Sequence, residues 1–424
     1  MSLFSDSEMT HSFVFFSIFA HSSKFIMRKL IFVVFCCLSA LFTTANDGVF
    51  YAEGNQLIPI TETDISVKKE VLTINRVGDH LEVTVYYEFF NPVGEKELLV
   101  GFEAKSPYNG KDPTTTFPRH PHIRNFKVVL NGETLSYDIA HVNKGTYDND
   151  GNYVASSYYK NGKFLNWSLQ QIKDTMNAWD YYDEMPVDYV YHFKAKFRPG
   201  LNIIQHTYDF DLSSSVEEEF YFPYVLTAAN RWANHQIDDF TLNINLGDCV
   251  SFHLFPDFFK SANEWKILGK GKVTTDTIWG FTDDKETPVF HIQKDGISFH
   301  KDNFHPNGEL RISQRRFWSF SWAYWDDFGK EEAYGLMEDV KEQYNTLYVY
   351  DYVNNDDLAK TAVSDNQKRI LKNLPFAYRG YIFKTKELQD YFESTKWYLP
   401  NPKYDGNMKV MTEEEKKWVE FWSD

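Results

Sequence analysis

A period of two in hydrophobicity dominates the chain from about Ile60 to Phe328. Such alternation is typical of β-strands, because successive side chains on a strand point to opposite faces of its sheet. The clearest run is Leu81, Val83, Val85, Tyr87 and Phe89. The turn residues Val77-Gly78-Asp79 stand just before it, after the shorter alternating segment that contains Leu72. Together these residues predict two antiparallel strands joined by a tight turn.

Further alternating segments follow, often bounded by turn residues such as Asn131-Gly132 and Pro199-Gly200. We expect strands at Phe126–Leu130, Val190–Phe197, Ile203–Phe210, Phe240–Leu246, Trp265–Leu268, Thr277–Phe281, Val289–Gln293 and Leu310–Tyr324. Many short strands with few helices between them are typical of a β-sandwich. The predicted fold class of residues 46–328 is therefore mainly β, an elaborated antiparallel β-sandwich that forms one unit or two sandwich halves.

Helical patterns occur in one insertion and at the C-terminus. A spacing of three or four residues within Phe164–Tyr182 predicts an inserted amphipathic helix, with its apolar face at Leu165, Leu169, Ile172, Met176 and Trp179. Residues 329–363 are acidic and are expected to form a helical connector. Residues 364–424 predict a small all-α domain, with N-caps at Ser364, Thr385 and Thr412 and helices at Asp365–Phe376, Thr385–Ser394 and Thr412–Trp422.

The N-terminal region predicts export. Met27-Arg28-Lys29 precedes a mostly apolar run from Leu30 to Phe42, and Thr43-Thr44-Ala45 supplies the small residues of a cleavage site. Residues 27–45 are thus expected to be a signal peptide cut near Ala45, and residues 1–26 an over-extended start. The apolar run is shorter than the about 20 residues of a membrane-spanning helix, so the mature chain is expected to have no transmembrane anchor. The expected location is periplasmic or extracellular.

The net charge and the number of cysteines bear on two questions, whether the protein binds nucleic acid and whether it has a reactive thiol. The formal net charge is -16, from 44 Lys and Arg against 60 Asp and Glu, and such a chain repels phosphate backbones. No nucleic acid partner and no cofactor are expected. Two of the three cysteines lie in the predicted signal, which leaves Cys249 in the mature chain. Cys249 is interpreted as a packed thiol, the alternative being a nucleophile.

The C-terminal segment resembles a known module. The resemblance lies in Ala377, in Gly380-Tyr381-Ile382-Phe383, in Tyr391-Phe392 and in Trp397-Tyr398. On these residues, from about 360 to 424, the segment resembles the YARHG domain of extracellular bacterial proteins. In the name-giving motif this chain departs from the family, since it has Phe376 for Tyr, Tyr378 for Arg and Arg379 for His. The resemblance implies attachment or scaffolding, with a cell-wall association and no catalytic residues.

A second resemblance concerns the β-rich region. Val71–Asn91 and Tyr224–Ile244, the latter with Ala229-Asn230-Arg231-Trp232-Ala233-Asn234, are similar to an uncharacterised family of exported bacterial β-sandwich proteins. This resemblance implies a fold and a compartment, but it implies no activity.

Aromatic residues account for 18% of the chain and gather between Phe317 and Trp325. If this run is a strand, one of its faces carries Trp318, Phe320, Trp322 and Tyr324. Trp325 stands at the end of the run. Two interpretations are open for this face. It packs into the core, or it is exposed and stacks on sugar rings.

Two segments have the residue types of a metal site. His120 and His122 stand two residues apart, so both can face one side of a strand, with His141 as a third ligand. The alternative is a solvated histidine pair. Asp148 and Asp150 resemble part of a calcium loop, but the glycine comes too early and a hairpin turn explains the same residues. The prediction is therefore that the protein holds no metal.

Hydrolase signatures are missing from the sequence, which has no Gly-x-Ser-x-Gly and no His-Glu-x-x-His. The leading hypothesis is an exported, non-enzymatic binding or scaffolding protein of the bacterial envelope, whose partner is cell-wall glycan or another envelope protein. The alternative is an extracytoplasmic hydrolase that acts on envelope glycan or peptide. The candidate contact residues are Trp318, Trp322, Trp325, Tyr378, Arg379 and Trp397.

Overall fold

The computed structural model divides the chain into two compact units, Met1–Gly48 and Val49–Asp424. All residues that it describes belong to the second unit. They are residues 54–60, 63–104, 113–143, 146–147, 153–154, 159–178, 187–212, 218–277, 286–315 and 364–423.

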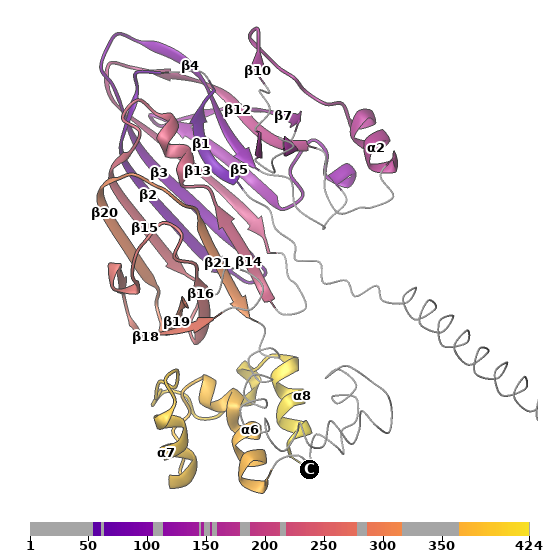
Figure 1. Ribbon diagram of the computed structural model, residues 1–424, viewed down its shortest axis with the longest axis vertical. Helices are drawn as coiled ribbons and strands as arrows, with labels where there is room; N and C mark the ends of the chain where they lie inside the picture. Colours follow the sequence, from indigo (N-terminus) through magenta and orange to yellow (C-terminus); the bar gives the residue numbers. More distant parts are fainter. Residues whose placement is uncertain are drawn as a thin grey trace, which may run out of the picture. The chain divides into compact units, whose positions relative to one another are not determined.

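One eight-stranded sheet organises the β-rich region (Figure 1). In spatial order its strands are β17 (Trp265–Ile267), β20 (Ile297–Phe304), β15 (Ile237–Asn245), β2 (Ser66–Val77), β3 (His80–Asn91), β13 (Gly200–Asp211), β5 (Ile123–Leu130) and β6 (Glu133–Leu135). The predicted β2–β3 pair is confirmed, and every second residue of β3 from Leu81 to Phe89 is buried. The strands of this sheet pair antiparallel except β2 and β15, which are parallel.

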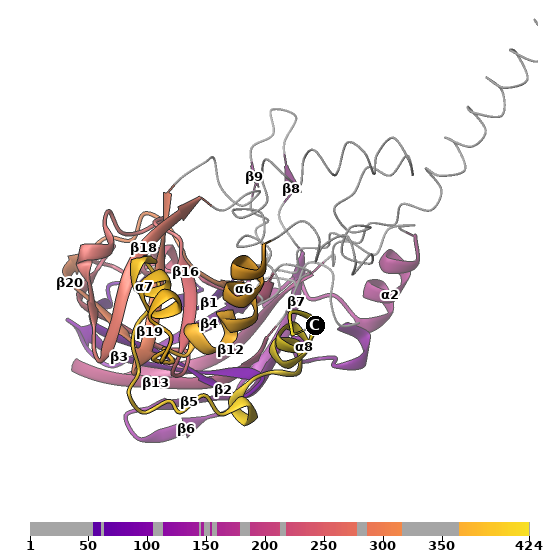
Figure 2. The same cartoon turned by 90° about the horizontal axis from the view of Figure 1, so that it is seen from below.

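Two smaller sheets complete the sandwich. The four-stranded sheet has the order β1 (Gly54–Pro59), β4 (Lys96–Ala104), β12 (Val187–Phe197) and β7 (Asp138–Asn143). The five-stranded sheet has the order β14 (Glu218–Tyr224), β21 (Leu310–Arg315), β16 (Val250–Leu254), β19 (Glu286–Lys294) and β18 (Lys270–Thr277). Figure 2 shows β18, β19 and β16 on one side of the core and β3, β13 and β2 on the other. The strands of the large sheet come from the whole length of the β-rich region, from β2 near its start to β20 near its end.

Short elements connect these sheets. Two hairpins pair β8 (Thr146–Tyr147) with β9 (Tyr153–Val154) and β10 (Tyr159–Lys160) with β11 (Lys163–Phe164). The predicted inserted helix is present as α2 (Leu169–Ala178) and begins later than its pattern suggested, because Phe164 belongs to β11. Trp179 of the predicted apolar face lies outside the described residues. Three 3-10 turns lie at η1 (Pro113–Thr115), η2 (Thr227–Arg231) and η3 (Ala262–Glu264).

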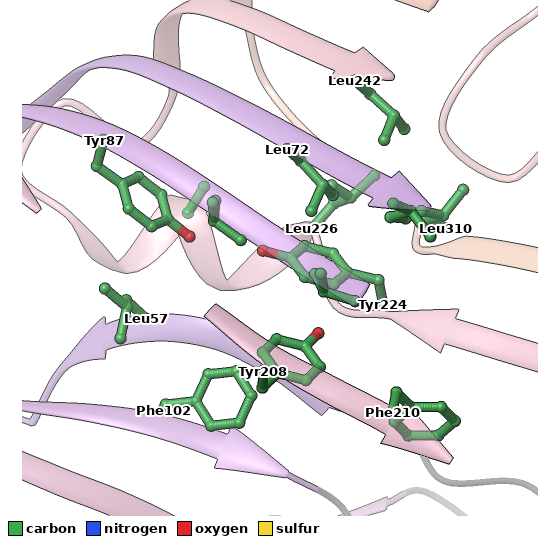
Figure 3. Close-up of a cluster of buried hydrophobic side chains, with 14 of the residues drawn as sticks. Leu57, Leu72, Tyr87, Phe102, Tyr208, Phe210, Tyr224, Leu226, Leu242 and Leu310 are labelled. Carbon is green, nitrogen blue, oxygen red and sulfur yellow. The ribbon is translucent and has the colours of Figure 1, made fainter. Parts of the chain in front are cut away.

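Aromatic and aliphatic side chains fill the space between the sheets (Figure 3). The ring of Phe102 on β4 lies 5.2 Å from that of Tyr208 on β13, so the four-stranded sheet packs on the large one. Phe210 on β13 lies 5.1 Å from Phe222 on β14, which joins the five-stranded sheet to the same face. Burial of these rings and of the aliphatic side chains around them is the main favourable contribution to the folding free energy. The predicted fold class is confirmed.

The C-terminal domain is helical, with α6 (Asp365–Tyr378), α7 (Lys386–Ser394), η4 (Met408–Val410) and α8 (Glu413–Phe421). Ser364 and Thr412 form the capping boxes expected of them, whereas Thr385 stands at the N-cap of α7 without a side-chain cap bond. A separate aromatic core holds the domain together and includes Leu371, Leu374, Phe383, Phe392, Tyr398, Trp418 and Trp422. Among the described residues, no helix combines the length and apolar character needed to span a bilayer.

Candidate functional site

Several of the predicted site residues lie outside the described residues. These are Trp318, Trp322 and Trp325 of the aromatic run, and Asp148 and Asp150 of the calcium-like loop. Their proposed contacts stay predictions.

The histidines of the predicted metal site are buried and bonded to the protein itself. Nδ1 of His122 lies 3.0 Å from the carbonyl oxygen of Asp211, and Nε2 of His141 lies 2.8 Å from that of Pro118. Nδ1 of His120 accepts a hydrogen bond of 3.1 Å from the His122 amide. Burial also lowers the pKa of His141. These contacts fix the rings within the core, and the three imidazoles do not form a ligand group.

A cluster that the sequence did not suggest lies on the surface of the large sheet. Among the described residues, Asp239, His300 and Asp302 are the only three potential metal ligands whose donor atoms all lie within 4.8 Å of one another. The imidazole of His300 is 3.6 Å from each carboxylate, and Lys69 Nζ lies 2.7 Å from Asp239. The arrangement is an exposed polar cluster, in which the Lys69 ammonium already balances part of the carboxylate charge.

A hollow of about 470 Å³ lies where β2 turns into β3 and β13 ends. It is lined by Asp79, His80, Arg124, Asp211 and Leu212. Arg124 Nε donates a 2.6 Å hydrogen bond to Asp211, and His80 lies 3.3 Å from Asp79 and lowers the pKa of that carboxyl. Each carboxylate that lines the hollow is therefore paired with a basic side chain.

Cys249 lies beside β16 and is half-buried, with its Sγ 3.8 Å from the carbonyl oxygen of Gln293. Burial raises the pKa of its thiol. A raised pKa lowers the fraction of reactive thiolate at neutral pH, so the environment favours the packed thiol over the nucleophile.

Tyr378 is the last residue of α6 and connects the helical domain to the β-rich region. Its hydroxyl oxygen accepts a 2.9 Å hydrogen bond from the backbone amide of Ser251 on β16. Burial raises the pKa of the Tyr378 phenol, so the neutral hydroxyl is present at physiological pH. The ring of Trp397 lies 6.3 Å from that of Tyr378. Two predicted contact residues are therefore neighbours.

Arg379 follows Tyr378 and binds inside the helical domain. Its guanidinium donates two hydrogen bonds to the Glu415 carboxylate, of 2.5 and 2.7 Å. It also donates to the carbonyl oxygens of Pro375 and Val410. The Glu415 side chain is only 4% exposed and accepts the Thr412 amide as part of the α8 capping box. Arg379 thereby ties the end of α6 to the start of α8.

Gly380 ends α6 with a φ of +77°, a conformation that favours glycine. A Cβ atom at this position would lie 2.1 Å from the Leu399 carbonyl oxygen and 2.8 Å from the Asn401 amide nitrogen. The Asn401 amide donates a 2.7 Å hydrogen bond to the Gly380 carbonyl oxygen. The motif segment and residues 399–401 therefore touch through their backbones.

We expect Gly380→Ala to destabilise the helical domain by about 2 kcal/mol or more, because the left-handed backbone costs an L-residue 1–2 kcal/mol and the Cβ clash adds to that cost. Gly406→Ala is the matched control, with a φ of +87° and only the Tyr381 ring near its Cβ. Urea unfolding of the two variants gives the comparison. Equal losses would contradict the close backbone approach at Gly380.

The segment after Trp397 receives three donors from the five-stranded sheet. Lys272 Nζ donates a 2.8 Å hydrogen bond to the carbonyl oxygen of Tyr398, and Gln293 Nε2 donates one of 2.6 Å to that of Leu399. Lys270 Nζ donates to the carbonyl oxygen of Pro400. Three consecutive carbonyls are thus each bound by a separate side chain of β18 or β19.

A buried polar chain lies under this contact. The imidazole of His291 lies 2.7 Å from Ser251 Oγ and 2.8 Å from Thr274 Oγ1. Burial, with the charges of Lys272 and His253, lowers the pKa of His291 to about 3. This neutral imidazole orients two hydroxyls. Nucleophilic triads require a carboxylate hydrogen-bonded to the imidazole, and among the described residues His291 has none. Sequence reasoning missed these residues, since no local pattern joins positions on β16, β18 and β19.

Comparison with known proteins gives one family match. Residues 342–423 match the YARHG domain, beginning within the acidic segment 329–363. Comparison with curated proteins gives no match.

Among solved structures, similarity is found to a candidate nutrient-binding protein of Legionella pneumophila, with 16% identity, 89% of this chain and 99% of that chain covered, and a TM-score of 0.45. Baculovirus P35 is similar at 10% identity over 61% of this chain and 99% of that one, with a TM-score of 0.21. Likenesses at this level carry no inference about function. The family match does identify one part of the molecule, and residues 342–423 of this chain are a YARHG domain.

Proposed function

We propose that this protein is a non-enzymatic binding or scaffolding protein of the bacterial cell envelope, exported by its N-terminal signal and associated with the cell wall through the YARHG domain. The observation that carries the proposal is that the side chains of the motif residues make contacts within the protein. Arg379 binds the buried Glu415, and Tyr378 binds a backbone amide of the sandwich. Both side chains hold parts of the protein together, and this structural use of the motif residues supports a non-enzymatic role.

Trp397 is the residue that we assign to glycan contact. It is half-buried, packs beside Phe392 and Tyr398, and lies in the loop that follows α7. A flat ring that is supported from one side and open on another can stack on a sugar ring. The aromatic run with Trp318, Trp322 and Trp325 supplies further candidate rings for the same ligand.

The mature chain, residues 46–424, is expected to co-sediment with purified peptidoglycan at low salt. Trp397→Leu keeps an apolar side chain in place but removes the flat ring, and should weaken retention about tenfold. Tyr391→Leu, at another half-buried aromatic residue of the same domain, is the matched control and should bind as the parent does.

No retention of the parent chain at low salt would overturn the cell-wall proposal. The same sample tests the hydrolase alternative, because soluble glycan or peptide fragments released from the pellet would contradict a non-enzymatic role.

A further inference from the structure

The contact between the YARHG domain and the five-stranded sheet has the features of a specific binding surface. Lys272, Gln293 and Lys270 donate to the carbonyl oxygens of Tyr398, Leu399 and Pro400 in turn. Hydrogen bonds to consecutive carbonyls require one register and one direction of the bound segment, because each donor side chain comes from a fixed strand position. Partial burial lowers the pKa of Lys272, as expected for a cation at the edge of a contact.

The second part of the contact uses a backbone group of the sheet and a side chain of the domain, the reverse of the first part. Here the sheet donates a backbone amide, that of Ser251, and the domain supplies the acceptor, the Tyr378 hydroxyl. Lysine or arginine could not replace Tyr378 in this role, because their side chains have donors only. The Ser251 hydroxyl is in turn bonded to the buried His291, so the residue that supplies the donor amide is held in place from beneath.

The two parts of the contact are joined within the domain. The Asn401 amide donates to the Gly380 carbonyl oxygen, two residues after Tyr378 and next to the carbonyl-presenting segment. We infer that the surface formed by Ser251, Lys270, Lys272 and Gln293 is a docking site whose partner is the YARHG domain of the same chain. Docking holds the domain and the sandwich as one body and reserves Tyr378 and residues 398–400 for this internal contact.

Hydrogen exchange of the mature chain, read by mass spectrometry, tests the docking site. The double variant Lys272→Ala/Gln293→Ala removes two of the side-chain donors. Amides in segments 249–254 and 398–401 should then exchange about tenfold faster, as expected for the loss of two hydrogen bonds. Amides of α8 should be unchanged, because the core of the domain does not depend on the contact.

Two controls keep the result interpretable. Lys194→Ala/Gln205→Ala changes the same residue types on β12 and β13, and should leave both segments protected. Tyr378→Phe deletes only the hydroxyl acceptor and should accelerate exchange in segment 249–254 even if the double variant fails to fold.

Equal exchange in the parent chain and in both docking variants would overturn the proposal. So would a parent chain that is dimeric at micromolar concentration and becomes monomeric in the double variant, since the domain would then dock on a second copy. Peptidoglycan binding plays no part in this test, so the docking site can fail while the proposed function stands, or the reverse.

Discussion

Replacing Arg379 with methionine is expected to destabilise the helical domain by about 3–5 kcal/mol, the usual cost of removing one partner from a buried ion pair. The Glu415 side chain is 4% exposed, so its carboxylate would stay buried after the substitution without its guanidinium partner. The Arg379 bonds to the Pro375 and Val410 carbonyl oxygens would be lost as well.

Urea unfolding followed by the circular dichroism of the helices measures this loss. The informative control is Arg379→Met/Glu415→Gln, because glutamine preserves the capping box with Thr412 and carries no charge. Most of the lost stability should return in the double variant. A loss below about 1 kcal/mol for the single variant would show that the pair behaves as an exposed one.

As the pH is lowered, the sandwich should begin to lose stability at about pH 6.5, well above the usual pKa of carboxyl groups. Burial lowers the pKa of His206 to about 3, and His291 has a similar value of about 3. The unfolded chain binds a proton on each imidazole below about pH 6.5, whereas the folded chain does not until about pH 3. Stability is therefore full above pH 6.5 and falls as the pH drops through this window. At pH 5 the loss is about 2 kcal/mol for each histidine.

His206→Leu should remove about half of this acid sensitivity. The ring of His206 lies among Tyr87, Phe102, Phe126 and Tyr208, and neither of its nitrogens has a hydrogen-bond partner among the described residues. Leucine fills a similar volume without a group that must stay neutral. Urea midpoints of parent and variant between pH 7 and pH 5 give the comparison. Parallel pH profiles would contradict the assignment.

The local part of the fold could be predicted from the sequence. Alternation revealed β2 and β3, and the capping residues Ser364 and Thr412 marked the starts of α6 and α8. Both signals reside in a few consecutive residues, because side-chain direction and cap bonds depend on near neighbours. The parallel neighbour of β2 could not be predicted, since β15 lies far along the chain and its pattern fits several partners.

The candidate site was predicted in part. Tyr378 and Arg379 were found through a family motif, but their partners Ser251 and Glu415 could not be. An arginine at a helix end has the same sequence pattern whether it faces water or a buried acid. The role of each motif residue therefore became visible only with the tertiary contacts, which also show that the two adjacent side chains serve different interfaces.

The parallel pairing of β2 with β15 has a consequence for how the protein is made. Ile237 pairs with Val67 and Asn245 with Asn75, so the middle of the large sheet joins residues about 170 positions apart. Contacts so distant in sequence slow folding, because a long loop must close before they form. During synthesis β2 and β3 can form a hairpin early, with the β2 edge open until β15 has emerged. A chain of this design can therefore complete its central sheet only after β15 has been made, when most of the β-rich region is already present.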